Sequence, residues 1–364
     1  MVNVITNQVI KISIEELRAI TKVDLCVFDL DGSVVASTFK NLDVKPDIIV
    51  KFSDSQADSQ VIGTDHLLKI SDDKESAYIL LARGASDDTY MVAKIAVSQI
   101  QHLIAAYKEK LDRNNFFQNL IMDNLLLVDI YNRAKRLHID VTIPYVVILV
   151  ETKLEKDSTA SEFMKSMFSA QNGDYITAVD EKNVILIKSL PNDESYESVE
   201  KIAHTIVDMM STEAMLNVRV SYGTIVPELK DVSKSYKEAK MALEVGKIFH
   251  MERKINAYNS LGIGRLVYQL PINLCKIFVE EIFGKDVPFE LDEETLITVK
   301  KFFDNSLNVS ETSRQLFVHR NTLVYRIEKL QKSTGLDIRT FDDALTLKIA
   351  MMVISYIKYL ETLS

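Results

Sequence analysis

The sequence has little of what stabilises a secreted protein or builds a metal centre. Its two cysteines, Cys26 and Cys275, lie far apart and match no disulfide or metal-ligand spacing. The six histidines are scattered and form no ligand pattern either. No apolar run approaches the ~18 residues that span a bilayer, and the N-terminus lacks the basic start and apolar centre of a signal peptide. We therefore expect a cytoplasmic protein that has reduced thiols, binds no metal or cofactor and does not enter a membrane.

Acidic residues outnumber basic residues, and the formal net charge is −9. This balance excludes a protein that coats nucleic acid with a uniformly basic surface, but it leaves open a basic face on one domain. The chain has 364 residues, of which 47% are hydrophobic. At roughly 100 to 200 residues per domain, the length predicts about two to four domains, each able to bury a core.

The first part of the chain has the pattern of a small sheet. Residues 24–37 read as a strand, a tight Asp-Gly turn and a second strand. Residues 76–84 form another apolar strand that ends in glycine, and a short strand is possible at 67–70. The remainder of 40–76 is polar and irregular. We expect a mixed sheet flanked by helices and assign residues 1–90 to this domain.

Residues 91–139 have a helical pattern throughout, which predicts connecting helices. One apolar seam with alternating spacings of three and four fits a coiled coil, and it allows two interpretations. The helix packs onto its own domain, or it pairs with a second copy of the chain. The seam residues are Val97, Ile100, Ile104, Tyr107 and Leu111.

Residues 140–255 alternate between strand and helix patterns. An apolar strand at 145–151 precedes a hairpin at 174–190, and a helix beginning near Asp231 follows the strand at 218–226. The order of elements predicts an α+β domain in which helices cover a largely antiparallel sheet. Residues 256–364 show no convincing strand pattern and are expected to be helical.

The helical region contains two short amphipathic segments joined by a tight connection. Ser310 is a plausible N-cap of a helix that runs through Phe317. After Val318-His319, a second helix extends from Arg320 to about Ser333, before Gly335. Two helices joined by about three or four residues form a helix-turn-helix.

The second helix divides into an apolar and a polar face at 100° per residue. Leu323, Ile327 and Leu330 share the face that must enter the core. Amide, hydroxyl and ammonium groups lie opposite, as a recognition helix in the major groove requires. Residues 309–334 carry five Lys or Arg and two Glu, a local excess of three positive charges in an acidic chain. An ordinary surface helix of a bundle is the simpler alternative.

The stretch "VHRNTLVYRIEKL" (318–330) resembles the C-terminal helix-turn-helix of the PucR/CdaR family of bacterial transcription regulators. The resemblance implies a regulator that binds double-stranded operator DNA, responds to a small-molecule effector and forms a homodimer or a higher oligomer. The residues that we expect at DNA, by this match and by the exposed face, are Ser310, Thr312, His319, Arg320, Asn321, Thr322, Tyr325, Arg326 and Lys329. On the helical wheel Arg326 lies toward the flank, where contact with phosphate is expected.

Residues 220–247 resemble the end of the GGDEF-like domain that these regulators carry. A working diguanylate cyclase holds nucleotide and metal with paired glycines in the turn of its central hairpin. The turn here, Asp180 to Asn183, has no glycine, so the backbone cannot approach a nucleotide closely. We predict a non-catalytic relay, with residual nucleotide binding as an alternative. The expected fold class is multidomain α+β: a PAS-like sensor, a degenerate GGDEF-like domain and an all-α DNA-binding domain.

The motif "FDLDG" (28–32) supports a rival hypothesis, because it resembles the first motif of haloacid dehalogenase-type phosphatases. By that match Asp29 is the nucleophile and Asp31 the general acid/base, around Mg²⁺. The mechanism needs a Rossmann-like scaffold of alternating strands and helices, which residues 40–90 do not offer. The simpler interpretation is an Asp-Gly hairpin turn, as in PAS-like sensors.

The N-terminal domain is similar to the sugar-diacid-recognition domain of the CdaR group. If the effector is an anionic diacid, it needs cationic partners, because a buried carboxylate without one is costly. Lys22 and Arg83 are the candidates that we select, and Lys51 and Lys69 are the other available cations.

Overall fold

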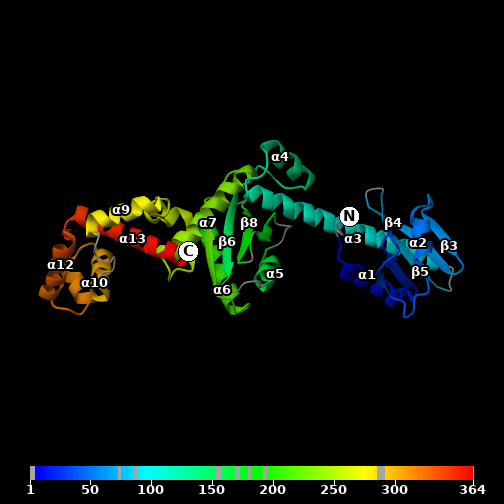
Figure 1. The fold of residues 1–364 in the computed structure, drawn as a ribbon, viewed down its shortest axis with the longest axis horizontal. Helices are drawn as coiled ribbons and strands as arrows, with labels where there is room; N and C mark the ends of the chain where they lie inside the picture. The colour runs from blue at the N-terminus through cyan, green and yellow to red at the C-terminus, as the bar shows by residue number, and fades with distance from the viewer. Residues whose placement is uncertain are drawn as a thin grey trace. The chain divides into compact units, whose positions relative to one another are not determined.

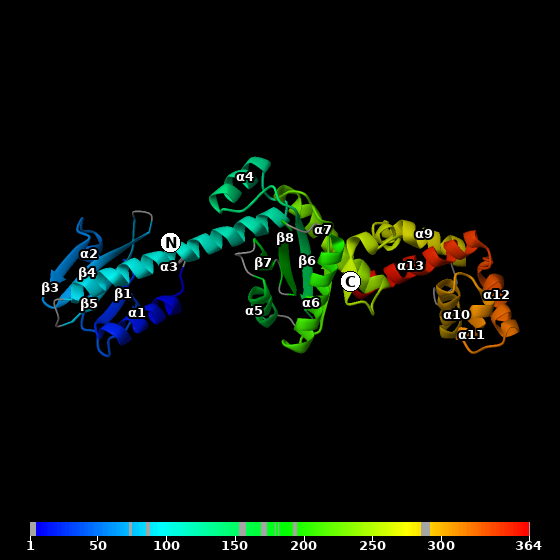
Figure 2. The ribbon, with the colours of Figure 1, turned by 180° about the vertical axis from the view of Figure 1, so that it is seen from behind.

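The structure is a computed structural model of the whole chain. It describes residues 5–72, 75–84, 88–152, 158–168, 173–178, 180, 182–191, 195–284 and 292–363. The chain divides into two compact units, Met1–Phe117 and Gln118–Ser364 (Figures 1 and 2). Within the described ranges, no helix has the length and apolar character that crossing a membrane requires.

The first unit is built on one antiparallel five-stranded sheet with strand order β2-β1-β5-β4-β3. Its strands are β1 (Asp24–Phe28), β2 (Val34–Ser37), β3 (Ser59–Ile62), β4 (Asp65–Asp72) and β5 (Glu75–Arg83). Its helices are α1 (Asn7–Thr21), α2 (Pro46–Ser53) and the first part of α3 (Thr89–Ile121). The predicted hairpin and the later strands are confirmed, whereas α2 and β3 occupy a stretch that was expected to be irregular.

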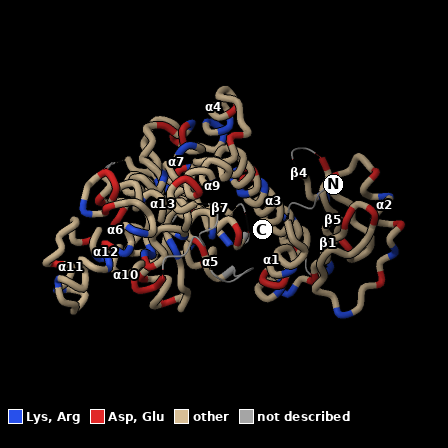
Figure 3. Tube along the Cα trace, turned by 60° about the vertical axis from the view of Figure 1, so that its left-hand side comes forward, with Lys and Arg blue, Asp and Glu red and all other residues tan. Residues whose placement is uncertain are grey.

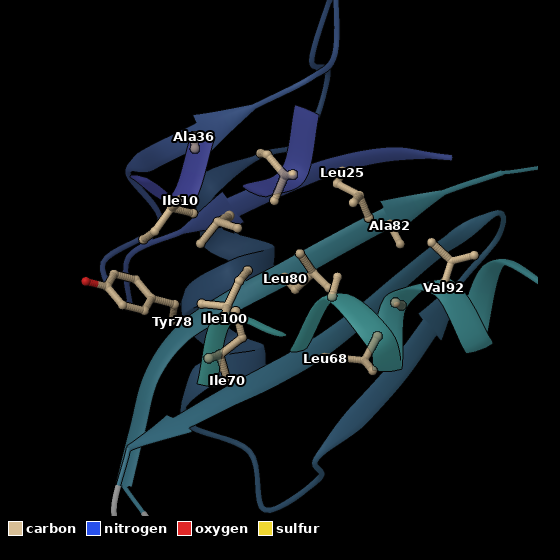
Figure 4. Close-up of a cluster of buried hydrophobic side chains, with 14 of the residues drawn as sticks. Ile10, Leu25, Ala36, Leu68, Ile70, Tyr78, Leu80, Ala82, Val92 and Ile100 are labelled. Carbon is tan, nitrogen blue, oxygen red and sulfur yellow. The ribbon is translucent and has the colours of Figure 1, made fainter. Parts of the chain in front are cut away.

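Each face of this sheet carries its own hydrophobic core. Ile10 of α1 and Ile100 of α3 pack with Leu80 and other sheet residues on one face (Figure 4). On the opposite face Phe52 of α2 packs with Phe28 and neighbouring side chains. Alternate residues of a strand point to opposite faces, so β1 and β5, which are buried on both sides, are apolar along most of their length.

The apolar seam of α3 packs mainly against its own domain. Ile100 and Ile104 are buried in the first core, and Val97 and Tyr107 are partly buried against it, while Leu111 is 45% exposed. The helix therefore packs onto its own domain, which is the first of the two interpretations given above. The helix ends at Ile121, and just beyond it Asp123 adopts a φ of +62°. A separate helix, α4 (Leu127–Arg136), follows.

The second unit begins with another five-stranded sheet, of order β10-β9-β6-β8-β7. The strands are β6 (Tyr145–Thr152), β7 (Tyr175–Ala178), β8 (Asn183–Ser189), β9 (Val218–Tyr222) and β10 (Ile255–Ala257). Helices α5 (Ser158–Met167) and α6 (Tyr196–Thr212) pack on one face, and α7 (Val232–Phe249) packs on the other. Only the β9–β10 pair is parallel among the described strands. The predicted α+β layering is confirmed, although β10 lies across the boundary that we expected after residue 255.

The rest of this unit is helical in its described part, as predicted. The helices are α8 (Gly264–Tyr268), α9 (Ile272–Phe283), α10 (Glu293–Asp304), α11 (Val309–Gln315), α12 (Arg320–Thr334) and α13 (Phe341–Leu363). Helix α13 runs beside α9 (Figures 1 and 2). Near its C-terminal end, the Tyr359 hydroxyl donates a hydrogen bond to Glu244 of α7. One helix therefore contacts both the helix-turn-helix region and the sheet domain.

Gly223 allows the end of β9 to approach α7 closely. A Cβ atom at this position would lie 2.1 Å from the main-chain carbonyl oxygen of Ser235. The Ser235 side chain is fully buried, accepts a hydrogen bond from the Val147 amide at 3.0 Å and donates one to the Thr224 carbonyl at 2.8 Å. The contact therefore involves backbone that is fixed on both sides and cannot yield locally.

We predict that Gly223→Ala lowers the free energy of unfolding of the second unit by about 3 kcal/mol, because overpacking against backbone displaces α7. The matched control is Gly262→Ala, where a Cβ meets no atom within 4 Å but φ is +54°. Strain alone should cost about 1 kcal/mol there. Urea unfolding monitored by circular dichroism measures both, and equal effects would contradict the role of the close contact.

Candidate functional site

Helices α10, α11 and α12 form a compact three-helix arrangement around one core. Leu323, Ile327 and Leu330 of α12 are 0%, 1% and 3% exposed, and they share a core with Phe302 of α10 and Leu347 of α13. Helices α10 and α12 lie side by side (Figures 1 and 2). The predicted apolar face of the second helix is thus confirmed, and its rotation about its own axis is fixed.

The first helix of the motif begins and ends differently from the prediction. Asn308, not Ser310, is its N-cap, and the Asn308 side chain accepts a hydrogen bond from the Glu311 amide at 3.1 Å. The helix stops at Gln315, because the chain adopts a φ of +55° at Phe317. Ser310 is exposed on the first turn of α11 and remains a candidate for contact with DNA.

His319 starts the second helix by capping it. Its Nδ1 atom accepts a hydrogen bond from the Asn321 amide at 3.2 Å. With Nδ1 as the acceptor, neutral imidazole carries its proton on Nε2. The exposed His319 side chain can therefore donate from Nε2 to an anion while Nδ1 holds the helix terminus.

The exposed face of α12 presents groups that suit the edges of base pairs. Arg320, Asn321, Thr322 and Lys329 are exposed, and Tyr325 is 66% exposed. Within the described residues, no ion pair engages Arg320, and Lys329 makes only a long contact of 3.9 Å with Asp292. These side chains can change their contacts without breaking a strong interaction in the protein.

Two of the residues expected at DNA belong to the interior of the motif instead. Thr312 is fully buried in α11, so it is unavailable to a ligand. Arg326 is mostly buried and pairs with Glu294 at 2.5 Å, and it also donates to the Thr298 hydroxyl of α10 at 3.2 Å. Arg326 differs from the prediction because α10 lies beside this flank of α12, which a helical wheel of α12 alone does not reveal.

An internal ion pair reduces the positive excess of α11. Arg314 donates two hydrogen bonds to Glu311, and Gln315 donates a third. The Arg314 and Gln315 hydrogen bonds lower the pKa of the Glu311 carboxyl to about 2, so it stays ionised at neutral pH. Acidic and basic residues are interspersed along this region (Figure 3). The free positive charge is therefore concentrated on α12.

The sequence did not single out Phe317, although its position is unusual. The side chain is 96% exposed in the turn between α11 and α12. The first helix was expected to run through Phe317, but it ends at Gln315, and Leu316 packs against the core while Phe317 does not. No periodicity covers a turn residue, so the sequence offered no signal for its exposure.

The cations predicted to bind an effector already have partners in the first unit. Arg83 donates two hydrogen bonds to Asp65 and one, at 3.0 Å, to Asp43, and it lies over the Phe39 ring. Lys22 ends α1 in the left-handed region and donates to the Ala19 carbonyl at 2.8 Å. Arg83 pairs with Asp65 because the two residues are cross-strand neighbours in the β4–β5 register.

The Asp29 and Asp31 carboxylates accept hydrogen bonds within their own turn. Asp29 accepts a hydrogen bond from the Leu30 amide, and Asp31 accepts one from the Ser33 amide, both at 2.8 Å. The Ser33 hydrogen bonds lower the pKa of the Asp31 carboxyl, whereas a general acid needs a raised pKa. The antiparallel sheet around them is also not the alternating scaffold that the phosphatase chemistry requires.

The hairpin turn of the second sheet has a comparable internal structure. The Asp180 carboxylate accepts hydrogen bonds from the amides of Lys182 and Asn183 at 2.9 and 2.8 Å, and the Asn183 side chain also donates to it. Glu181 lies outside the described residues. The oxygens of Asp180 that would hold a nucleotide-bound metal are thus engaged in holding the turn.

Comparison with known proteins gives the same division of the second unit. Residues 124–245 match the GGDEF-like domain, and residues 295–353 match the PucR C-terminal helix-turn-helix domain. The chain is 26% identical over 265 residues to the carbohydrate diacid regulator of Escherichia coli (strain K12), covering 70% of this chain and 68% of that protein.

Two regulators from Bacillus subtilis (strain 168) are also similar. The purine catabolism regulatory protein is 25% identical over 66% of this chain, which spans about half (48%) of that longer protein. The DNA-binding transcriptional activator AdeR is 23% identical over 47% of this chain and 42% of its own length. The chain thus contains a GGDEF-like domain followed by a PucR C-terminal helix-turn-helix domain, and it is similar to transcriptional regulators of the PucR/CdaR type.

Proposed function

We propose that this protein binds operator DNA in the cytoplasm through the exposed face of α12 and regulates transcription in response to a small molecule. One observation carries the proposal: α12 buries Leu323, Ile327 and Leu330 and leaves Arg320 and Asn321 exposed without an ion pair among the described residues. Helix-turn-helix proteins read the major groove with the first residues of the second helix.

Each exposed group has a role that its chemistry suits. Asn321 can form a bidentate pair with adenine, and Arg320 can bind the O6 and N7 atoms of guanine or a phosphate. His319 can donate from Nε2 to a phosphate, and Ser310 on α11 can do the same from its hydroxyl, because the first helix crosses the backbone. Thr322, Tyr325 and Lys329 complete the surface, from which we leave out Thr312 and Arg326.

Two copies of the chain would act together on one operator. A single recognition helix makes few contacts, and a dimer doubles them on two half-sites that lie about 34 Å apart, one turn of the double helix. Ligand binding can change DNA affinity only if it favours one arrangement of the two recognition helices over another. We propose a homodimer in which the effector controls the spacing of the two recognition helices, and with it the half-site spacing that the dimer binds.

The middle domain serves as a relay without catalysis in this proposal. Its hairpin turn has no glycine to admit a nucleotide, and the Asp180 carboxylate is engaged by the turn itself. A polar cluster connects the domain to α13: Lys247 pairs with Glu151 at 2.5 Å and Glu244 at 2.9 Å, and Glu244 accepts from Tyr359. Burial of the Tyr359 phenol and its bond to Glu244 raise its pKa, so it remains a donor at neutral pH.

The first unit is the proposed PAS-like sensor, and a carboxylate such as a sugar diacid is the proposed effector. The similarity to a carbohydrate diacid regulator supports this class. Arg83 offers an arrangement in which a carboxylate could replace a protein group. Its partner Asp43 has a side chain that is 81% exposed, so the Arg83–Asp43 pair can open to solvent more easily than the Arg83–Asp65 pair.

We predict that Arg320→Ala and Asn321→Ala each weaken specific DNA binding about 10- to 100-fold, because each removes a contact with a base edge. Duplexes selected by the full-length protein from a random-sequence library provide the probe, and fluorescence anisotropy at several salt concentrations measures affinity. If Arg320 binds phosphate instead, its loss should lower the salt slope by about one.

Lys240→Ala is the matched control, since Lys240 is an exposed cation on α7, away from the proposed surface. It should leave the affinity unchanged. Thermal unfolding of all three variants should match that of the parent protein. Unchanged DNA affinity in both α12 variants would overturn the proposed function.

We also predict that a carboxylate effector raises the melting temperature of the full-length protein. A ligand at 100 times its Kd stabilises the folded state by about 2.7 kcal/mol. A thermal-shift screen compares sugar diacids, purines and amino acids.

The Asp43→Asn variant tests whether the effector binds Arg83, because it removes the protein carboxylate that competes with a ligand carboxylate for Arg83. A carboxylate that binds Arg83 should bind this variant more tightly, whereas a purine should be unaffected. A thermal shift with purines alone, or weaker carboxylate binding by Asp43→Asn, would contradict the proposed effector class.

A further inference from the structure

Phe317 is the most exposed of the large hydrophobic side chains in the described part of the chain, at 96%. The ring therefore gains almost nothing from folding, since hydrophobic stabilisation requires removal of apolar surface from water. Its neighbours Leu316 and Val318 both pack against the core of the helix-turn-helix. The exposure thus belongs to this one position in the turn and not to a loosely packed loop.

The backbone of Phe317 adds a second unfavourable feature. Its φ of +55° lies in the left-handed region, which glycine adopts without a penalty and bulky residues seldom adopt. The turn of a helix-turn-helix often contains glycine. In the free protein, a glycine here would remove both the strain and the hydrated ring, so the stability of the fold does not account for a phenylalanine.

Backbone hydrogen bonds of the turn hold the main chain of Phe317 just before the recognition helix. The Phe317 amide donates to the Arg314 carbonyl at 3.2 Å, and the Val318 amide donates to the Ser313 carbonyl at 3.0 Å. Phe317 comes two residues before the N-cap His319, and the first residues of a recognition helix contact base edges. The DNA that receives Arg320 and Asn321 would therefore also meet this ring.

We propose that Phe317 is a specificity-determining residue whose ring packs against the C5-methyl group of a thymine in the major groove. This inference rests on the proposed DNA-binding function. Major-groove edges otherwise present mainly hydrogen-bond donors and acceptors, which an aromatic ring would desolvate without replacing their bonds. The thymine methyl is the apolar group among them, so the ring favours a T·A pair at that position.

The test uses the full-length protein and a duplex selected by it from a random-sequence library. Each thymine in the selected motif is replaced in turn by deoxyuridine, which lacks only the C5-methyl group. One replacement should weaken binding by the parent protein about fourfold, the effect of exposing one methyl-sized apolar group. Phe317→Ala should bind the thymine and deoxyuridine duplexes equally at that position, and its own selected motif should lose the preference for T·A there.

Phe317→Gly separates the DNA contact from folding. Glycine tolerates the positive φ, so this variant should unfold at the same or a higher temperature than the parent protein while it loses the discrimination against deoxyuridine. Phe341→Ala is the matched control, because Phe341 is a 73% exposed phenylalanine at the start of α13. It should keep the fourfold discrimination.

The possible failures are distinguishable. If the parent protein selects no motif, the proposed function itself is overturned. If it selects a motif but both Phe317 variants keep the deoxyuridine effect, the inference about Phe317 is overturned and DNA binding stands. A loss of affinity that is equal on all sequences would indicate a contact with the sugar-phosphate backbone and would also overturn it, as would the same change in Phe341→Ala.

Discussion

The burial of Leu323, Ile327 and Leu330 fixes the rotation of α12, and the proposed contact with DNA depends on this constraint. Each residue of a helix advances by 100°, so a slip of a single position would turn the exposed groups away from the proposed DNA-binding side. Three anchors at spacings of four and three residues remove this freedom. Burying each side chain contributes about 1.5–3 kcal/mol, which makes other rotations unfavourable.

Arg326 reinforces the same constraint from the edge of the helix. Its bonds to Glu294 and Thr298 connect α12 to α10 through a guanidinium that is 21% exposed. A planar group with several donors holds orientation as well as distance. The residue that the helical wheel placed at the flank thus holds α12 against α10.

The sequence predicted features that depend on periodicity. The two faces of α12 and the hairpin of β1 and β2 each follow from a pattern within one short segment. The residues of that segment are therefore enough to predict the element. Strand β3 was missed because all four of its residues are exposed, which removes any alternation. Helix α2 has only eight residues, about two turns, so its helical period hardly repeats.

The remaining errors concern partners that are distant in the sequence. Arg326 and Glu294 are 32 residues apart, and Arg83 meets Asp65 only through the pairing of β4 with β5. The seam of α3 was identified, but a heptad pattern does not reveal whether a sheet or another helix covers it. Thr312 is buried although its side chain is polar, so residue type alone predicts the wrong exposure for it.

Helix α13 has a consequence for how such regulators can be recombined. Its first half completes the core around α12, and its last turns lie against α7, where Tyr359 bonds to Glu244. A graft that joins this DNA-binding region to a foreign sensor needs more than a cut before α10. Unless the graft includes α7, the end of α13 loses its polar partner. The chimera then exposes apolar surface, which promotes aggregation.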